Sequence, residues 1–335
     1  MGTDPPPRPP TKRLTSFSSP QADVIVFSAG NNGHRPSPTS AHIGGTAAAK
    51  NCITVGATQA TRNIIDAGFN ATGTLGSHKS LAFFSSLGPT VEKRPKPDVV
   101  APGLPILSAG SRMPNITAER RNAFGVTTDP EWVFMSGTSM STPLVAGCCV
   151  ILREALIETA KVDLPSAALV KALLINGAVD IGLDRDRQGF GLVNLKRALV
   201  PVENTKPRAG ESSDPLVGFV DEGFVAGKKL AEDEKWMHEI DIPASAKGDV
   251  LKVTLAYSDR YGPEVQNNLS LLVQIGGTEK AGDEGFRAEN TVEQVVWKDV
   301  PDGPGKVVIT VTADRIARLG DAQPFAVVWA HYKEV

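Results

Sequence analysis

Short, unbroken runs of apolar residues mark the first part of the chain. Three such runs occupy residues 23–30 (DVIVFSAG), 52–58 (CITVGAT) and 98–103 (DVVAPG), and each contains a glycine near its end. Strands of a parallel sheet are buried on both faces, so they read as continuous apolar runs and not as alternating ones. The pattern therefore predicts three buried parallel strands.

Two helices are predicted after these strands. Residues 139–158 are apolar on nearly every side as far as Arg153, which is typical of a helix in the middle of a protein. We expect this helix to run from about Thr138 to Glu158. Residues 165–174 open with a proline and continue with apolar residues at i, i+3 and i+4, which predicts a second helix. Strands mixed with helices in this way indicate a three-layer α/β arrangement with a mainly parallel sheet.

Alternation with a period of two replaces these runs in the last third of the chain. In residues 250–257 apolar side chains alternate with Lys252, Thr254 and Ala256. Comparable candidate strands follow at residues 269–277, 291–300, 306–313 and 324–332. Short strands of this kind, separated by turns such as PDGPG, indicate an antiparallel β-sandwich or barrel, of a jelly-roll-like type.

The same patterns divide the chain into three segments. Residues 1–20 are rich in Pro, Ser and Thr and lack the apolar stretch of a signal peptide, so we interpret them as a flexible lead-in. Residues 201–215 are polar and Pro-rich, which is typical of a connection between domains. We therefore expect an α/β domain over residues 21–204 and a β domain over residues 205–335. The sequence assigns no cellular compartment.

Composition excludes several classes of protein. With 41% hydrophobic and 21% charged residues, the 335-residue chain has enough apolar side chains for a sizeable core. Its 35 basic and 37 acidic residues leave a net charge of −2, which argues against nucleic-acid binding. No window approaches 18 consecutive apolar residues, so no membrane span is predicted. The three cysteines, Cys52, Cys148 and Cys149, form neither a disulfide framework nor a zinc motif, and the adjacent pair is expected to be buried and inert.

The sharpest chemical signal is the string GTSMSTP at residues 137–143. It places Ser139 where a loop enters the long predicted helix, so that its oxygen and any neighbouring oxyanion lie near the positive end of the helix dipole. A serine in such a place can be an activated nucleophile, provided that another group takes its proton. It can equally be a helix N-cap, a position that serine favours. Spacing alone leaves both interpretations open.

Residues 137–143 resemble the nucleophile motif of the subtilisin-like serine proteases. Further strings match the family in the same order, at residues 28–33 (SAGNNG), 48–57, 84–89 (FSSLGP), 96–103 (KPDVVAPG) and 188–194 (QGFGLVN). The resemblance implies hydrolysis of polypeptides through an acyl-enzyme on Ser139, without a required cofactor. It also implies an oxyanion hole made by Asn31 and the Ser139 N–H, and substrate binding along Ser28, Ala29 and Gly30.

The aspartate and histidine of such a catalytic triad are missing from this sequence. In the family they lie upstream of the oxyanion segment, in Asp-(Thr/Ser)-Gly and His-Gly-Thr-His, and neither string occurs here. The strand that pairs with the substrate backbone is also missing. We expect each of the five histidines to be solvent-exposed or structural, and Asp98 to be structural, as the family uses it.

Two explanations of this gap stay open. The chain is either part of a protease that acts together with a missing N-terminal half of the catalytic domain, or a pseudoprotease that binds peptides or a partner. In both cases residues 1–335 alone are expected to hydrolyse peptides poorly or not at all, because Ser139 lacks a base. The incomplete sheet should also expose an unpaired edge and apolar surface beside it.

Residues 205–335 resemble the β-barrel domain that follows the catalytic domain in certain alkaline subtilases. The resemblance is carried by residues 255–259 (LAYSD), 267–271 (NNLSL) and 290–293 (NTVE). Relatives carry acidic residues where this chain has Asn268 and Ser270, which argues against calcium at that loop, since calcium prefers carboxylate oxygens. Three acidic residues, Asp259, Asp283 and Glu284, remain candidate calcium ligands. A carbohydrate-binding β domain is a weaker alternative, because the chain has only four Trp and three Tyr.

Overall fold

The computed structural model describes residues 23–34, 42–61, 70–71, 77–113, 117–123, 125–127, 129–206, 212–243, 246–262, 264–282, 290–301 and 305–333. The predicted lead-in over residues 1–20 and two candidate calcium ligands, Asp283 and Glu284, lie outside these described residues.

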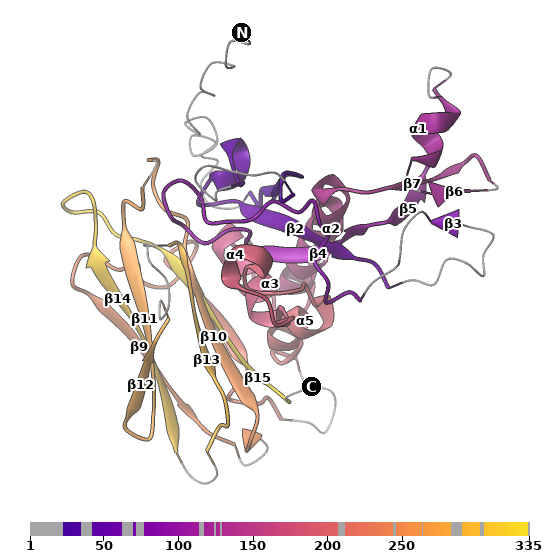
Figure 1. The fold of residues 1–335 in the computed structure, drawn as a ribbon. Helices are drawn as coiled ribbons and strands as arrows, with labels where there is room; N and C mark the ends of the chain where they lie inside the picture. Colours follow the sequence, from indigo (N-terminus) through magenta and orange to yellow (C-terminus); the bar gives the residue numbers. More distant parts are fainter. Residues whose placement is uncertain are drawn as a thin grey trace.

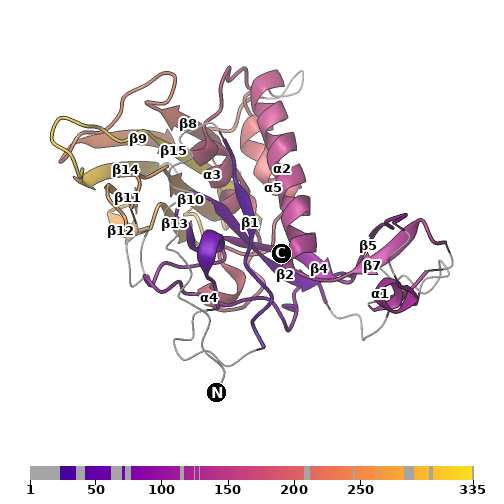
Figure 2. The same ribbon diagram turned by 90° about the horizontal axis from the view of Figure 1, so that it is seen from above.

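The three predicted parallel strands are confirmed and form one sheet. They are β1 (Val26–Ser28), β2 (Ile53–Gln59) and β4 (Val99–Leu104), arranged in the order β1-β2-β4. Both pairings are parallel, and Val55 of β2 lies between Ser28 and Val99 in register. Most side chains of β2 and β4 are buried, which explains why these segments read as continuous apolar runs. The long helix that follows packs against this sheet, and two later helices pack against the C-terminal strands (Figures 1 and 2).

Both predicted helices are present. The long helix α2 spans Thr138–Glu158, as expected, and α3 spans Ala167–Gly177. Ser166 caps α3, since its side-chain oxygen accepts a hydrogen bond from Leu169 N at 2.9 Å. The shorter helical elements are η1 (Gly45–Ala48), α1 (Ala118–Asn122), α4 (Arg185–Gln188) and α5 (Leu195–Glu203). One face of α2, with Val145, Cys149, Leu152 and Leu156, packs into a core shared with the sheet and with α3.

The expectation that α2 is buried all round is wrong. Its other face leaves Leu144 45%, Val150 66% and Ile151 43% exposed. The physical reason is that the described sheet has only three strands, and no described element covers that face in Figure 2. Among the described helices, α2 alone is long and apolar enough to cross a membrane. A helix that packs one face into a protein core has the same length and composition, so this feature does not assign a membrane span.

The expectation that both adjacent cysteines are buried holds only for Cys149. Cys148 is half-buried, because it lies between the covered and the open faces of α2. Burial raises the pKa of the Cys149 thiol to about 12, so this thiol remains protonated near neutral pH.

A narrow arm extends away from the body of the molecule (Figures 1 and 2). Its stem is the antiparallel pair β5 (Ile106–Ala109) and β7 (Trp132–Met135), and α1 lies beyond the stem, with the short pair β3 (Asn70–Ala71) and β6 (Gly125–Val126) beside it. The segment from β5 to β7 enters the arm directly after β4 and leaves it directly before α2, whereas β3 comes from an earlier part of the chain, between β2 and β4. The arm therefore begins and ends beside the GTSMSTP string.

The last third of the chain forms two four-stranded antiparallel sheets. Their orders are β13-β10-β15-β8 and β12-β11-β14-β9. The strands are β8 (Gly218–Glu222), β9 (Lys235–Asp241), β10 (Val250–Ala256), β11 (Asn268–Ile275), β12 (Thr278–Ala281), β13 (Val292–Trp297), β14 (Lys306–Arg315) and β15 (Phe325–Tyr332). Side chains of both sheets, such as Val253 and Val311, share one buried cluster. All five strands expected from the alternating pattern are present, and the closer assignment to a jelly-roll-like domain stays a prediction.

The parallel sheet and the C-terminal sheets are joined through a continuous buried junction. Ala256, Val292 and Val328 of the C-terminal strands belong to the same apolar cluster as α2 and α3. Lys50, just before β2, places its ammonium 2.5 Å from the Asp259 carboxylate, and both side chains are buried. Asn51 exchanges two hydrogen bonds with the backbone of Asp259, at 2.7 and 2.9 Å. The junction therefore resembles a protein core more than a hinge.

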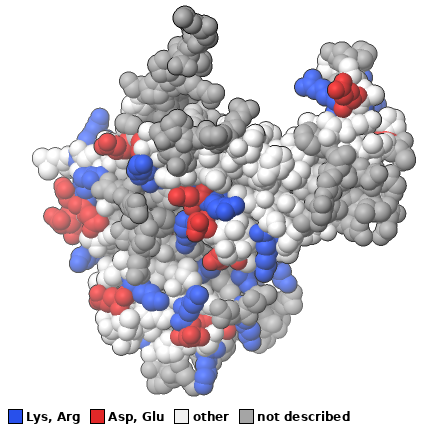
Figure 3. Space-filling view, in the orientation of Figure 1, with Lys and Arg blue, Asp and Glu red and all other residues white. Residues whose placement is uncertain are grey.

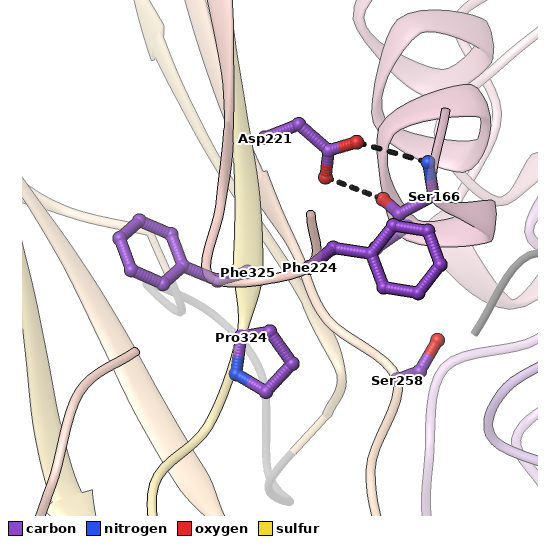
Figure 4. A pocket seen from close by; sticks show the side chains of 7 residues that line it. Ser166, Asp221, Phe224, Ser258, Pro324 and Phe325 are labelled. Carbon is purple, nitrogen blue, oxygen red and sulfur yellow. Dashed lines mark hydrogen bonds between the residues drawn. The ribbon is translucent and has the colours of Figure 1, made fainter. Parts of the chain in front are cut away.

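A small pocket lies in this junction, between the start of α3 and β8 (Figure 4). Asp221 of β8 accepts hydrogen bonds from the Ser166 N–H at 2.9 Å and from the Ser166 hydroxyl at 2.6 Å. Burial raises the pKa of Asp221, although the bonds from Ser166 oppose this effect.

On the face drawn in Figure 3, basic and acidic side chains are intermixed, and neither sign of charge forms a patch of its own.

Lys252 gives the junction a predictable pH dependence. Its side chain is buried and donates to the carbonyl of Ala178 at the end of α3. Burial, with the charges of Arg197 and Arg185, lowers its pKa from 10.5 to about 8. The folded state therefore disfavours protonated Lys252 below pH 8, and this penalty disappears as the pH rises from 8 towards 10.5.

We expect wild type to gain about 3 kcal/mol of unfolding free energy relative to Lys252→Met over that pH range, since one pKa unit corresponds to about 1.4 kcal/mol. Denaturant unfolding at several pH values measures the difference. The exposed substitution Lys229→Met is the control and should show no such trend. A wild-type advantage that stays constant or declines with rising pH would contradict the assignment.

Candidate active site

Ser139 is the second residue of α2, and its side chain is exposed. The helix begins at Thr138 with Gly137 as its N-cap, so Ser139 does not cap it. The first N–H groups of a helix have no acceptor within the helix and carry its positive dipole end. Ser139 thus combines an accessible hydroxyl with a backbone environment that favours negative charge.

Asn31 lies against the start of this helix, although 107 residues separate it from Thr138. Its side-chain oxygen accepts two hydrogen bonds, from the N–H and from the hydroxyl of Thr138, each at 2.9 Å. These two donors fix which end of the amide is the oxygen. The remaining end, Nδ2, is the donor of this side chain, and Asn31 is exposed to solvent.

Two glycines allow this close approach. Gly137 has a positive φ of 154°, and a Cβ there would lie 3.2 Å from Asn31 Nδ2. Gly30 has a φ of 103°, and a Cβ there would lie 2.9 Å from the Ser86 hydroxyl. A larger residue at either position would strain the backbone and displace a neighbour.

The predicted substrate-binding residues lead directly into Asn31. Ser28 ends β1, Ala29 is buried and donates its N–H to Val55 O at 2.9 Å, and Gly30 N donates to the Thr138 hydroxyl at 3.2 Å. The structure therefore brings Ser28, Ala29, Gly30 and Asn31 together with the motif of Ser139. Whether they bind substrate stays a prediction.

Asp98, the residue just before β4, belongs to a buried charge cluster. Its carboxylate is paired with Lys96 and with Lys171, whose ammonium lies 3.1 Å away, and it accepts a hydrogen bond from Thr54 N at 2.7 Å. Burial alone would raise the pKa of Asp98, but the charges of Lys171 and Lys96 outweigh it, so the pKa lies below its ordinary value. Its contacts agree with the structural role that was expected.

The histidines lie in other surroundings. His34 packs against Phe83 with ring centroids 5.9 Å apart, and His238 stacks on Trp236 at 5.5 Å. His331 lies between the carboxylates of Asp249 and Asp214, at 2.7 and 2.9 Å. Within the described ranges, no hydrogen bond joins a histidine or a carboxylate to the hydroxyl of Ser139.

The described His, Cys, Asp and Glu side chains do not indicate a metal site. Among the described residues, no group of three or more His, Cys, Asp or Glu is arranged to hold a metal ion. The carboxylate of Asp259, a candidate calcium ligand, accepts hydrogen bonds from the N–H groups of Gln266 and Asn267, at 2.8 and 2.9 Å, in addition to its pairing with Lys50. The calcium expectation otherwise stays a prediction.

Sequence reasoning did not single out Thr138 and Ser86. The buried hydroxyl of Thr138 accepts from Gly30 N and donates to Asn31 Oδ1, and so connects α2 to the oxyanion segment. The Ser86 hydroxyl accepts from Asn32 N at 3.1 Å, and Ser86 N donates to Gly30 O at 2.9 Å. Thr138 and Ser86 both lie inside strings that matched the family. The strings alone do not indicate that these two hydroxyls form hydrogen bonds with the segment of Gly30, Asn31 and Asn32.

We expect Thr138→Val to loosen Asn31, because valine keeps the shape of threonine but loses the hydroxyl. A buried hydrogen bond contributes about 1 kcal/mol, and the unpaired Gly30 N–H adds a cost of similar size. Faster amide hydrogen exchange at Gly30, and a changed NMR signal of the Asn31 side-chain amide, would report this. Thr138→Ser keeps the hydroxyl and should behave as wild type. Equal effects of both substitutions would contradict the positioning role.

Comparison with known proteins assigns the family. The family model described as "Subtilase family" matches residues 10–193, which is more than half of the chain. The chain belongs to the subtilase family, and it is therefore a subtilisin-type serine peptidase by family.

Several curated proteases are similar to parts of the chain. Serine protease AprX of Bacillus subtilis (strain 168) is 35% identical over 178 residues, covering 52% of this chain and 35% of AprX. The serine protease/ABC transporter B family protein tagA of Dictyostelium discoideum is 28% identical over 267 residues, covering 68% of this chain and 14% of tagA. The chain thus spans well under half the length of these relatives. Among solved structures, a lanthipeptide protease is 19% identical with a TM-score of 0.40, covering 56% of this chain and 54% of that one.

Proposed function

We propose that this chain carries the nucleophile and oxyanion part of a serine endopeptidase. The observation that supports the proposal most is the double hydrogen bond from Thr138 to Asn31 Oδ1, which leaves Nδ2 as the donor end of this amide beside the start of α2. In the proposed mechanism, Ser139 Oγ attacks a peptide carbonyl. A general base takes the Ser139 proton, and the side-chain amide of Asn31 and the N–H of Ser139 donate to the oxyanion. The peptide C–N bond then breaks, the amine leaves with the proton returned by the base, and an acyl-enzyme remains on Ser139 until water hydrolyses it.

The proposed general base comes from polypeptide other than the described residues. Serine is a weak nucleophile until a base takes its proton, and the base in turn needs an orienting acid. The family resemblance places an aspartate and a histidine upstream of the oxyanion segment. We therefore propose a polypeptide substrate, and a complementing segment that supplies both groups to Ser139.

A chimera tests this proposal. The segment of AprX that lies upstream of its match to this chain is fused ahead of Met1, and hydrolysis of a generic peptide is measured. We expect Ser139→Ala to abolish turnover, and Asn31→Ala to reduce kcat by about two to three orders of magnitude, as loss of one oxyanion donor does. A folded chimera without turnover, or with turnover that survives Ser139→Ala, would contradict the proposal.

A pseudoprotease that binds peptides or a partner is the second candidate function. It is favoured by one observation, namely that within the described ranges no histidine or carboxylate is hydrogen-bonded to the Ser139 hydroxyl. This candidate predicts that the chimera folds and binds peptide without cleaving it.

A further inference from the structure

The connection from β1 to β2 carries Asn31 near its start and Lys50 and Asn51 at its end. The structure describes residues 29–34 and 42–52 of this connection, with η1 in its second half. Asn31 is held by Thr138 at the start of α2, whereas Lys50 is 1% exposed and lies in the junction with the C-terminal strands. The position of Asn31 therefore depends also on the groups that hold the other end of its own connection.

The C-terminal region holds this other end from two places. Before β11, the Asp259 carboxylate lies 2.5 Å from the Lys50 ammonium, and the backbone of Asp259 exchanges two hydrogen bonds with Asn51. Before β13, the Thr291 hydroxyl donates to the Lys50 carbonyl at 3.0 Å. The same carbonyl accepts a longer bond, at 3.3 Å, from Lys171 of α3. The end of the connection is thus fixed mainly by residues that lie more than 200 positions further along the chain.

The turn η1 lies between this end and the oxyanion segment. Ala47 and Ala48 of η1 belong to the same small buried cluster as Ala29. Ala29 is followed by Gly30, whose N–H donates to the Thr138 hydroxyl. Closely packed apolar side chains transmit displacements, because little empty space separates them. A shift at the end of the connection therefore reaches the oxyanion segment through η1.

From these contacts we infer that Asp259 of the C-terminal region positions the oxyanion donor Asn31, acting through Lys50 and Asn51. The inference rests on the proposed function and adds that the oxyanion hole depends on the C-terminal region. The described hydrogen bonds of Asp259 reach neither Asn31 nor Ser139, so Asp259 is a positioning residue and not a catalytic one. A merely structural residue would stabilise the whole fold, whereas a positioning residue restrains the segment of Asn31 in particular.

Native-state hydrogen exchange of residues 1–335, followed by NMR, separates these two roles. Asn51→Ala removes the two bonds to the backbone of Asp259 and leaves the buried charges paired. Asp221→Asn is the matched control. Asp221 lies in the same junction, but it bonds to Ser166 at the start of α3 and not to the connection from β1 to β2 (Figure 4).

Two backbone N–H groups report the result. The N–H of Gly30 bonds to the Thr138 hydroxyl, and the N–H of Leu169 bonds to the residue that caps α3. We expect Asn51→Ala to speed exchange at Gly30 about tenfold, as loss of buried hydrogen bonds does, and to leave Leu169 unchanged. Asp221→Asn should have the opposite pattern. Equal acceleration of both N–H groups in each variant would overturn the inference, because the contacts would then only stabilise the fold.

Thr291→Val provides a second test, which does not require Asn51→Ala to fold. Valine keeps the shape of threonine but loses the hydroxyl that donates to the Lys50 carbonyl. We expect exchange at Gly30 to become about threefold faster, since one hydrogen bond is lost, and Thr291→Ser to restore the wild-type rate. No change at Gly30 in Thr291→Val would overturn the inference.

The chimera with the upstream AprX segment connects the positioning to catalysis. We expect Asn51→Ala to lower kcat about tenfold with KM unchanged, because an oxyanion donor acts in the transition state and a small misplacement weakens it. Asp221→Asn should change neither constant. An active chimera whose kcat is unaffected by Asn51→Ala would overturn the inference and keep the proposed function. The expected exchange pattern, combined with an inactive chimera, would keep the positioning of Asn31 and refute the peptidase proposal alone.

Discussion

Residues 1–335 alone should hydrolyse peptides about a millionfold more slowly than a complete subtilase of comparable kcat. Without a base the Ser139 hydroxyl keeps its high pKa, and almost none of it is ionised near neutral pH. In subtilisin, a member of this family, loss of the catalytic serine or histidine lowers kcat by about 10⁶-fold, and the remaining acceleration comes from the oxyanion hole and binding. The expected rate is therefore close to that of a protein without a nucleophile.

The measurement is turnover of a generic peptide by the purified chain, next to its Ser139→Ala variant. Both proteins should give the same rate. A serine that is never activated does not contribute to turnover, so its removal does not change the rate. Turnover that approaches a complete protease, and is lost in Ser139→Ala, would show that the chain contains a base which neither its sequence nor the described residues reveal.

The second large effect is expected in the buried charge cluster. Asp98→Asn leaves the ammonium groups of Lys96 and Lys171 without their counter-charge, and both lysines are at most 4% exposed. Breaking a buried pair by removing one partner costs about 3–5 kcal/mol. Typical domains are stable by only about 5–15 kcal/mol, so much of the protein's stability would be lost.

Denaturant unfolding at pH 7 measures this loss, and Asp163→Asn, at an exposed aspartate, serves as the control. The effect should shrink in acid, because the folded pKa of Asp98 is depressed and its contribution is lost as the pH falls through that value. A loss below about 1 kcal/mol would mean that the lysines shed their protons or find other partners.

The sequence predicted the elements whose side chains are buried in a regular pattern. The continuous runs became β1, β2 and β4, and the helix over Thr138–Glu158 was located to the residue. The edge strands β8, β9 and β12 were not predicted, because few of their side chains are fully buried and their apolar signal is weak. The arm was not predicted either, since β5 and β7 have only four residues each and pair across a long connection.

The candidate site was predicted less completely, for a different reason. The strings around Asn31 and Ser139 indicated that these residues meet, and they do lie together at the start of α2. The contact of Lys50 with Asp259 spans 209 residues, and no local pattern indicates such a pairing. Similarly, the composition of α2 predicted burial on all sides, but composition does not say which polypeptide covers each face. The exposure of Val150 therefore emerged only from the structure.

The most direct measurement is labelling by a fluorophosphonate probe, with mapping of the modified residue by mass spectrometry. It is applied to residues 1–335 alone and to the chimera with the upstream AprX segment. A hydroxyl reacts with the probe only when a base activates it and an oxyanion hole receives the developing charge. We predict labelling of Ser139 in the chimera, little or none in the chain alone, and a large reduction in the Asn31→Ala chimera. Equal labelling of Ser139 in both proteins, or modification in the chimera at any residue except Ser139, would contradict the account.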